Sequence, residues 1–240
     1  MIRLENLTKK YGEFTAVSNL SLSIPKGEIF GFIGPNGAGK TTTIKMMGGI
    51  MDPTSGSIDI CGISMKDEPE KAKRNIGFIP DRPYLYEKLT GNEFLRFIGN
   101  LYDVDDRSFA ARAEEKLNMF SLLAWADELI ESYSHGMKQR LVMAAALLHD
   151  PEVIIVDEPM VGLDPVAVRM VKDLFKHLSG QGLTIFMSTH TLKVAEDVCD
   201  RIGIIHKGVV IATGTTDDLK KKSLLADADL EDAFIKLTSL

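Results

Sequence analysis

Residues 28–42, EIFGFIGPNGAGKTT, decide the fold. The part EIFGFI has the apolar and aromatic composition of a buried strand, and GPNGAGKTT fits the pattern GxxxxGK[ST]. Its glycines let a loop fold tightly, so that backbone N–H groups point inward at phosphate oxygens, while the following helix adds its positive end. About one chain in a hundred of this length would contain the bare pattern by chance. The stretch therefore predicts a strand, a phosphate-binding loop and a helix.

Each residue type in the loop suits a nucleotide phosphate. Lys40 is expected to neutralise the β and γ phosphates, and Thr41 to offer its hydroxyl to Mg²⁺, which prefers oxygen ligands. The residues expected to bind the nucleotide here are Gly34, Pro35, Asn36, Gly37, Ala38, Gly39, Lys40, Thr41 and Thr42.

Composition narrows the class of protein. The chain has 240 residues, 45% of them apolar, with a formal net charge of -6, which argues against a general nucleic-acid or anionic-membrane surface. The longest apolar run, residues 141–148, is far shorter than the ~20 residues that span a bilayer. The charged residues near the N-terminus argue against a signal peptide. We expect a soluble, cytoplasmic chain. Cys61 and Cys199 lack metal or redox spacing, so we expect buried thiols and no zinc site.

Strand patterns divide the chain. Residues 2–33 alternate as in an antiparallel sheet with one wet face, broken near Gly12 and at 25–27. Compact apolar strands follow at IGFIP (76–80), VIIVD (153–157), TIFMST (184–189) and IGIIH (202–206). With helices between them, these strands predict a parallel α/β core of the P-loop NTPase type.

Residues from about 85 to 132 have helical periodicity instead. Thr90 and Glu93 fit a capping box, and apolar residues recur at helical spacing from Phe94 and again from Phe109. We therefore expect a helical subdomain, at about 85–135, inserted into the core. The tail after about residue 215 is typical of a polar linker and a short amphipathic, surface-packed helix.

Two further strand ends carry polar residues. Asp157 and Glu158 follow VIIV, at the carboxyl end of a parallel strand, where ligands of such sheets bind. Asp157 suits Mg²⁺, and Glu158 suits a general base for an attacking water; the alternative is a pair of acids that end a strand and cap a helix. His190 follows TIFMST at the same edge, within reach of a γ-phosphate, although a lone histidine is more often structural.

The stretch YSHGMKQR (133–140) begins a helix without any acid. Ser134 is a good N-cap, and we expect the helix to run over about 135–149, before Pro151. Helix N-termini attract negative charge, and Gly136 costs about 1 kcal/mol of helix stability relative to alanine. An anion from outside the chain accounts for both features; an ordinary capped helix with arbitrary surface residues is the alternative.

Together these residues resemble the ATP-binding subunit of an ABC transporter, over residues 2 to about 215. GPNGAGKTT resembles the Walker A motif, VIIVDE the Walker B motif with its catalytic glutamate, and VGLD (161–164) the D-loop. YSHGMKQR resembles the LSGGQ signature, and His190 the switch histidine. Tyr11 stands where the family places an adenine-stacking aromatic, although a turn tyrosine fits the same position.

The resemblance implies a head-to-tail dimer, most simply of identical chains, in which Ser134 and Gly136 of one subunit contact the ATP of the other. His135 and Met137 depart from the signature, so no role carries over to them. Asp81 stands where the family has a glutamine that links Mg²⁺ and water to the membrane partner. Its carboxylate still offers oxygen to Mg²⁺ but adds negative charge and lacks the amide donor.

The function implied is ATP hydrolysis, with ATP and Mg²⁺ as cofactors and Glu158, His190 and Lys40 as catalytic residues. It drives a conformational change in a separate transmembrane permease at the cytoplasmic face of the membrane. Asp81, Met137 and the ending LEDAFIKLT are similar to the subgroup that exports sodium, antibiotics or other drugs. The alternatives are a soluble ABC-type ATPase acting on nucleic acid or ribosomes, and a small-molecule kinase with the same phosphate loop.

Overall fold

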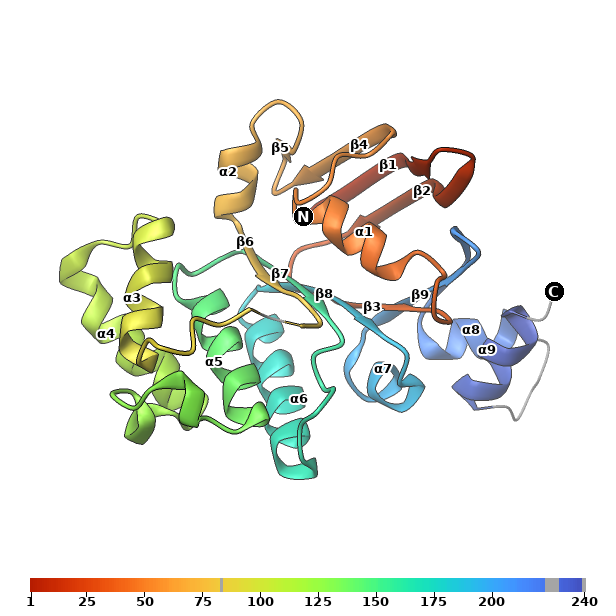
Figure 1. Cartoon of the computed structure of the whole chain (residues 1–240). Helices are drawn as coiled ribbons and strands as arrows, with labels where there is room; N and C mark the ends of the chain where they lie inside the picture. The colour runs from red at the N-terminus through yellow and green to blue at the C-terminus, as the bar shows by residue number, and fades with distance from the viewer. Residues whose placement is uncertain (83, 223–228, 239–240) are drawn as a thin grey trace.

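The computed structural model describes residues 1–82, 84–222 and 229–238. Figure 1 shows a four-stranded sheet at the top and a six-stranded sheet across the middle, with most of the helices below it. The expected α/β fold, with a parallel core, an N-terminal antiparallel sheet and inserted helices, is confirmed. Within the described residues, no helix combines the length and the apolar character needed to cross a membrane.

The smaller sheet is antiparallel, with the order β2-β1-β4-β5. Its strands are β1 (Ile2–Tyr11), β2 (Phe14–Ile24), β4 (Ser55–Ile60) and β5 (Ile63–Ser64). Buried and exposed residues alternate along the second half of β2, as expected for a sheet with one face in solvent. A turn at Gly12, where φ is +57°, places Tyr11 opposite Phe14.

The larger sheet has the order β10-β9-β3-β8-β7-β6, and only β10 runs antiparallel to its neighbour within the described part of the chain. Its strands are β3 (Ile29–Ile33), β6 (Ile76–Ile79), β7 (Val153–Asp157), β8 (Thr184–Thr189), β9 (Arg201–His206) and β10 (Val209–Gly214). The strands β3, β7 and β8 are adjacent and buried along their whole length. Because parallel strands end at the same edge, the residues that follow these three strands lie together.

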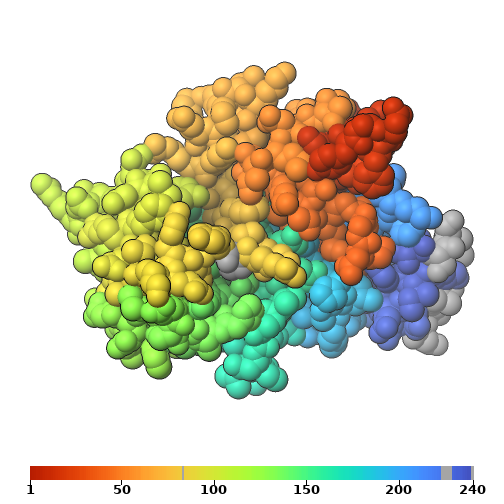
Figure 2. Space-filling view, viewed as in Figure 1, coloured from red at the N-terminus to blue at the C-terminus, as the bar shows by residue number. Residues whose placement is uncertain are grey.

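Helices connect the strands and cover the sheet. They are α1 (Lys40–Met47), α2 (Pro69–Arg74), α3 (Gly91–Leu101), α4 (Asp106–Met119), α5 (His135–Leu147), α6 (Pro165–Gly180), α7 (Leu192–Val198), α8 (Thr216–Lys222) and α9 (Leu230–Thr238), with short 3-10 helices at Leu123–Trp125 and Ile130–Ser132. In the space-filling view, the yellow-green lobe that contains α3 and α4 projects to the left of the body (Figure 2).

The expected helical insertion is present, but the prediction that residues 85–132 are helical throughout is wrong. The capping box of Thr90 and Glu93 is formed, and α3 starts only after it. The preceding residues are not helical because their backbone groups pair elsewhere: the N–H groups of Ile130 and Glu131 donate to the carbonyls of Leu89 (2.9 Å) and residue 87 (3.0 Å). This pairing ties the segment after β6 to the chain just before α5.

The C-terminal tail also differs from its prediction. The part expected to be a polar linker includes a helix, α8, and the rest of it, residues 223–228, lies outside the described residues. The amphipathic helix α9 packs as expected: it buries Leu230 and Ala233, and Leu230 joins an apolar cluster with Leu219 of α8 and Ile33 of β3.

Candidate active site

The phosphate loop joins β3 to α1, as the sequence predicts. Gly37 and Gly39 have φ of +78° and +110°, in the region that favours glycine. A Cβ at Gly39 would lie 2.6 Å from the carbonyl oxygen of Ala16, so a side chain is excluded on steric grounds as well. The first turn of α1 contains no acidic residue, which leaves the positive end of the helix unneutralised by its own side chains.

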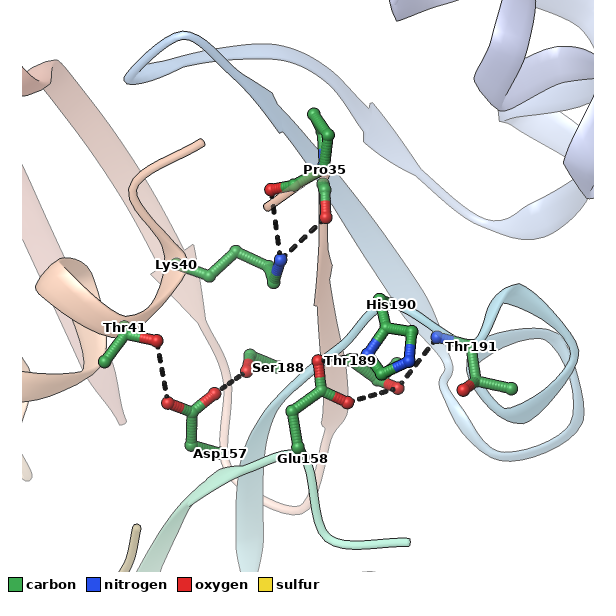
Figure 3. A network of polar contacts seen from close by, with 10 residues as sticks. Pro35, Lys40, Thr41, Asp157, Glu158, Ser188, Thr189, His190 and Thr191 are labelled. Atoms are coloured by element: carbon green, nitrogen blue, oxygen red, sulfur yellow. Dashed lines mark hydrogen bonds and ion pairs between the residues drawn. The ribbon is translucent and has the colours of Figure 1, made fainter. Parts of the chain in front are cut away.

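Lys40 lies inside the loop and not on the surface. Its Nζ donates hydrogen bonds to the carbonyl oxygens of Gly34 (2.7 Å) and Pro35 (3.3 Å) (Figure 3). Burial lowers the pKa of Lys40, while Glu158 and Asp157 act in the opposite direction and favour the charged form. The ammonium group is thus poorly solvated and close to the place where a phosphate would enter.

Asp157 is fixed at both of its carboxylate oxygens. Thr41 Oγ1 donates to Oδ2 at 2.9 Å, and Ser188 Oγ donates to Oδ1 (Figure 3). Asp157 and Ser188 are register partners in β7 and β8, so the sheet itself aligns this pair. Asp157 is only 3% exposed, and a buried carboxylate needs such donors.

The Thr41–Asp157 pair fits a Mg²⁺ ion. Both side chains present oxygen and both line the same cleft. Across the described residues, no group of three acidic, histidine or cysteine side chains forms a metal cage of protein ligands alone. Mg²⁺ is usually bound by one or two protein oxygens, with water and substrate phosphates as its other ligands.

Glu158 has an unusual backbone and a tightly held side chain. Its φ of +52° is uncommon for a residue other than glycine and has a cost in conformational energy, which in proteins is most often tolerated at functional sites. The carboxylate is held on both sides: Oε1 lies 2.8 Å from His190 Nδ1, and Oε2 accepts from Thr189 Oγ1 at 3.2 Å. Figure 3 shows this arrangement beside the Thr41–Asp157 pair.

Most of the expected residues line one cleft of about 490 Å³. It is lined by Tyr11, Phe14, Ala16, Asn36, Gly37, Gly39, Lys40, Thr41, Thr42, Asp81, Asp157, Glu158, Val161 and His190. Tyr11 and Phe14 are 47% and 64% exposed, so both rings are available to a flat ligand. Gly34 and Pro35 contribute carbonyls that bind Lys40, and Ala38 is buried beneath the loop.

Ser134 and Gly136 are not part of this cleft. Ser134 is the N-cap of α5, as predicted, and its Oγ accepts from Met137 N at 3.2 Å. The helix ends slightly earlier than predicted, at Leu147, and its first turn has no acid. One copy of the chain therefore does not bring its own signature stretch to its own phosphate loop.

The start of α5 faces a second cleft, of about 520 Å³. Its lining comes from the segment after β6 and from α5: Asp81, Arg82, Tyr84, Leu85, Glu87, Lys88, His135, Lys138 and Gln139. Lys138 Nζ and Glu87 Oε1 join the two sides at 2.5 Å. Asp81 lines both clefts and so links the first cleft to the second.

Several residues of the site were not predicted from the sequence. Ser188 and Thr189, which hold Asp157 and Glu158, close the strand TIFMST, and their hydroxyls at the functional edge of the sheet were an available signal. Phe14 was signalled by its place in the same hairpin as Tyr11. Val161 lines the cleft without a recognisable sequence signal.

A family model described as ABC transporter matches residues 17–161. The chain belongs to the ABC transporter family. It is an ATP-binding domain of that family and an ATPase. The matched range includes the phosphate loop, Asp81, the start of α5, Asp157 and Glu158.

The relatives of this ABC ATPase cover nearly all of its length. The linearmycin resistance ATP-binding protein LnrL of Bacillus subtilis is 43% identical over 219 residues, which are 91% of this chain and 70% of the relative. The ABC-type transporter ATP-binding protein EcsA of the same organism is 34% identical, over 99% of this chain and 96% of the relative. The probable multidrug ABC transporter ATP-binding protein YbhF of Escherichia coli is 37% identical, but the chain spans only 41% of it.

Solved structures agree on the fold. An ATP-binding subunit of an ABC transporter has a TM-score of 0.93 and 35% identity, with 99% of both chains covered. A dimeric bacterial ABC transporter cassette has a TM-score of 0.81 and 31% identity, covering 90% of this chain and 98% of that structure.

Proposed function

We propose that this ABC ATPase hydrolyses ATP in the 490 Å³ cleft by the action of Glu158 on water, and that hydrolysis drives a separate transmembrane partner. The observation that carries the proposal is the position of Glu158: it lines the cleft of the phosphate loop and is clamped by Thr189 and His190. A carboxylate held in one orientation can align a water and accept its proton. The water oxygen bonds to the γ-phosphorus as the bond to the bridging oxygen breaks, which gives ADP and phosphate.

The other cleft residues divide the remaining work. Lys40 offsets the phosphate charge, and Tyr11, with Phe14 beside it, provides a surface for adenine. His190, which is held by Glu158, contacts the γ-phosphate. Thr41, Asp157 and Asp81 would hold Mg²⁺, which would supply positive charge to offset the charge of the phosphates.

We further propose that the active unit is a head-to-tail dimer, most simply of two copies of this chain, in which Ser134 and Gly136 contact the ATP of the other copy. The start of α5 supports this, because it has no acid in its first turn and the nearest group to a Cβ at Gly136 is Leu163 Cδ2, at 3.8 Å. A helix N-terminus whose backbone is this accessible can bind an anion. A solved relative described as a dimeric ABC transporter cassette supports a dimeric unit.

The second cleft is the proposed contact with a transmembrane permease. Beside it, the rings of Tyr84, Tyr86 and Phe97 form an edge-to-face series with centroids 5.6 and 5.2 Å apart, and Tyr84 is 83% exposed. Exposed aromatic residues next to a charged cleft are typical of protein interfaces. Because Asp81 lines both clefts, its segment is suited to transmit motion between them.

Such a partner would place the chain at the cytoplasmic face of the membrane. We propose outward transport of a small solute or drug, since one relative is named for linearmycin resistance and another as a probable multidrug transporter protein. These names and the net charge of -6 favour transport over action on nucleic acid or ribosomes.

We also propose residues 1–215, with the helical insertion at about 85–135, as the ATPase domain and 216–240 as a tail.

Phosphate release from Mg²⁺ and ATP, with no acceptor added, tests this function. The wild-type chain should release phosphate, and Glu158→Gln should lower kcat by at least about 100-fold, because the amide accepts no proton. Formation of ADP that requires a small-molecule acceptor and releases no free phosphate would indicate a kinase instead. Full activity of Glu158→Gln would contradict the role of this carboxylate.

A further inference from the structure

The His135 ring lies directly on the backbone of Gly162. A Cβ at Gly162 would lie 2.5 Å from His135 Cδ2, so the ring would have to shift to admit a side chain at Gly162. Gly162 also has a φ of +76°. His135 replaces a glycine of the family signature, so this contact comes from a residue to which no family role carries over.

Neighbouring residues extend the contact. Gly136 faces Leu163 Cδ2, and Met137 packs against the same apolar core cluster as Met160 and Leu163. Met137, the other departure from the signature, therefore has a packing role: its thioether side chain sits against the core that supports the loop. The first turn of α5 and residues 160–163 therefore lie against each other and against the same apolar cluster.

Residues 158–164 form a short loop that begins at the candidate catalytic glutamate. Glu158 N donates to Ser188 O at 3.1 Å, and Val161 N donates back to the carbonyl of Glu158 at 3.2 Å. At the other end, Asp164 Oδ1 caps α6 by accepting from Val166 N and Ala167 N, both at 2.9 Å. The loop is fixed at its two ends, and the His135 ring supports its middle.

We infer that His135 is a positioning residue for Glu158. Its ring, seated on Gly162, holds the 158–164 loop against the start of α5 and so restricts the backbone from which Glu158 projects. His135 also lines the second cleft, so a conformational change in that cleft reaches the 158–164 loop through the His135 side chain. The inference rests on the proposed role of Glu158 in hydrolysis.

A double-mutant cycle on the full chain, with kcat and KM measured by phosphate release, tests the inference. His135→Ala should lower kcat about tenfold with KM for ATP unchanged within about twofold, because the contact orients the base and does not bind nucleotide. His135→Phe, which keeps a flat ring over Gly162, should restore kcat to within about threefold of wild type. Gly162→Ala strains the backbone at φ +76° in both backgrounds, but it should lower kcat more in the wild-type background than in the His135→Ala background, where the added methyl group meets no ring.

An equal loss from Gly162→Ala in both backgrounds, or an unchanged kcat in His135→Ala, would overturn the inference. If Gly162→Ala does not fold, the comparison of His135→Ala with His135→Phe decides alone, and equal kcat values would overturn it. Failure of the proposed function looks different: the wild type would then release no phosphate, or Glu158→Gln would keep the full rate.

Discussion

Replacement of Thr189 by valine removes one of the two side-chain contacts that orient Glu158. Thr189 is 2% exposed at the end of β8. Its Oγ1 donates to Glu158 Oε2 at 3.2 Å and accepts from Thr191 N at 3.1 Å. Valine has nearly the same shape, so Thr189→Val deletes these two hydrogen bonds with little change in packing.

The size of the effect follows from the charge on the acceptor. A hydrogen bond to an ionised group contributes about 1.5–3 kcal/mol. If the bond serves to align Glu158 for hydrolysis, its loss lowers kcat by about 10- to 150-fold. KM should stay nearly unchanged, because Thr189 is not among the residues that line the cleft.

Steady-state phosphate release checks this, with Thr184→Val as the matched control. Thr184 lies at the other end of the same strand, is fully buried, and makes side-chain hydrogen bonds to Gly27 N at 3.1 Å and Pro25 O at 3.4 Å. Thr184→Val should lower the unfolding free energy by about 1–3 kcal/mol and leave kcat intact. Equal kcat losses in the two variants, or none at Thr189, would refute the reasoning.

Three further predictions concern affinity and stability. Gly39→Ala, which forces a Cβ to 2.6 Å from Ala16 O at a φ of +110°, should weaken ATP binding at least about tenfold in a calorimetric titration, because the phosphate loop must distort. Burial lowers the pKa of His149 from 6.5 to about 4, so as the pH falls the histidine takes up a proton in the unfolded chain before it does so in the folded chain. The free energy of unfolding, measured in urea, should therefore drop by up to about 3 kcal/mol between pH 6.5 and 4. This dependence on pH should be weaker in His149→Gln. Tyr133→Phe removes the 2.6 Å hydrogen bond to Trp125 O and should cost about 0.5–1.5 kcal/mol in the same assay.

Local patterns in the sequence were enough to predict the centre of the site. The strand, loop and helix at residues 28–42 are encoded in consecutive residues. Asp157 and Glu158 lie at the same edge of the sheet as this loop, because parallel strands end at one edge. The N-cap at Ser134 and the capping box at Thr90 were likewise predictable, since their partners lie three residues away.

Contacts between distant segments were not predictable in this way. The pairing of Ser188 with Asp157 depends on the register of β7 and β8, and the contact of His135 with Gly162 depends on where α5 is packed. The residues that follow residue 85 are not helical, because the carbonyls of residues 87 and 89 accept hydrogen bonds from the backbone of residues 130–131. Local periodicity does not reveal such a pairing. These tertiary contacts are the ones that orient the predicted residues.

We propose that ATP joins two copies of this chain, with Ser134 and Gly136 of each copy against the ATP of the other. The most direct measurement is the mass of Glu158→Gln in solution, with ATP and Mg²⁺ and without nucleotide, compared with Ser134→Arg in the same background. We expect the mass to shift from 26.5 kDa to twice that value only with ATP and Mg²⁺. We expect no shift in the Ser134→Arg double variant, because the larger cationic side chain occupies the place of the phosphate contact. A chain that binds ATP and stays at 26.5 kDa, or a Ser134→Arg variant that dimerises as well as its parent, would contradict it.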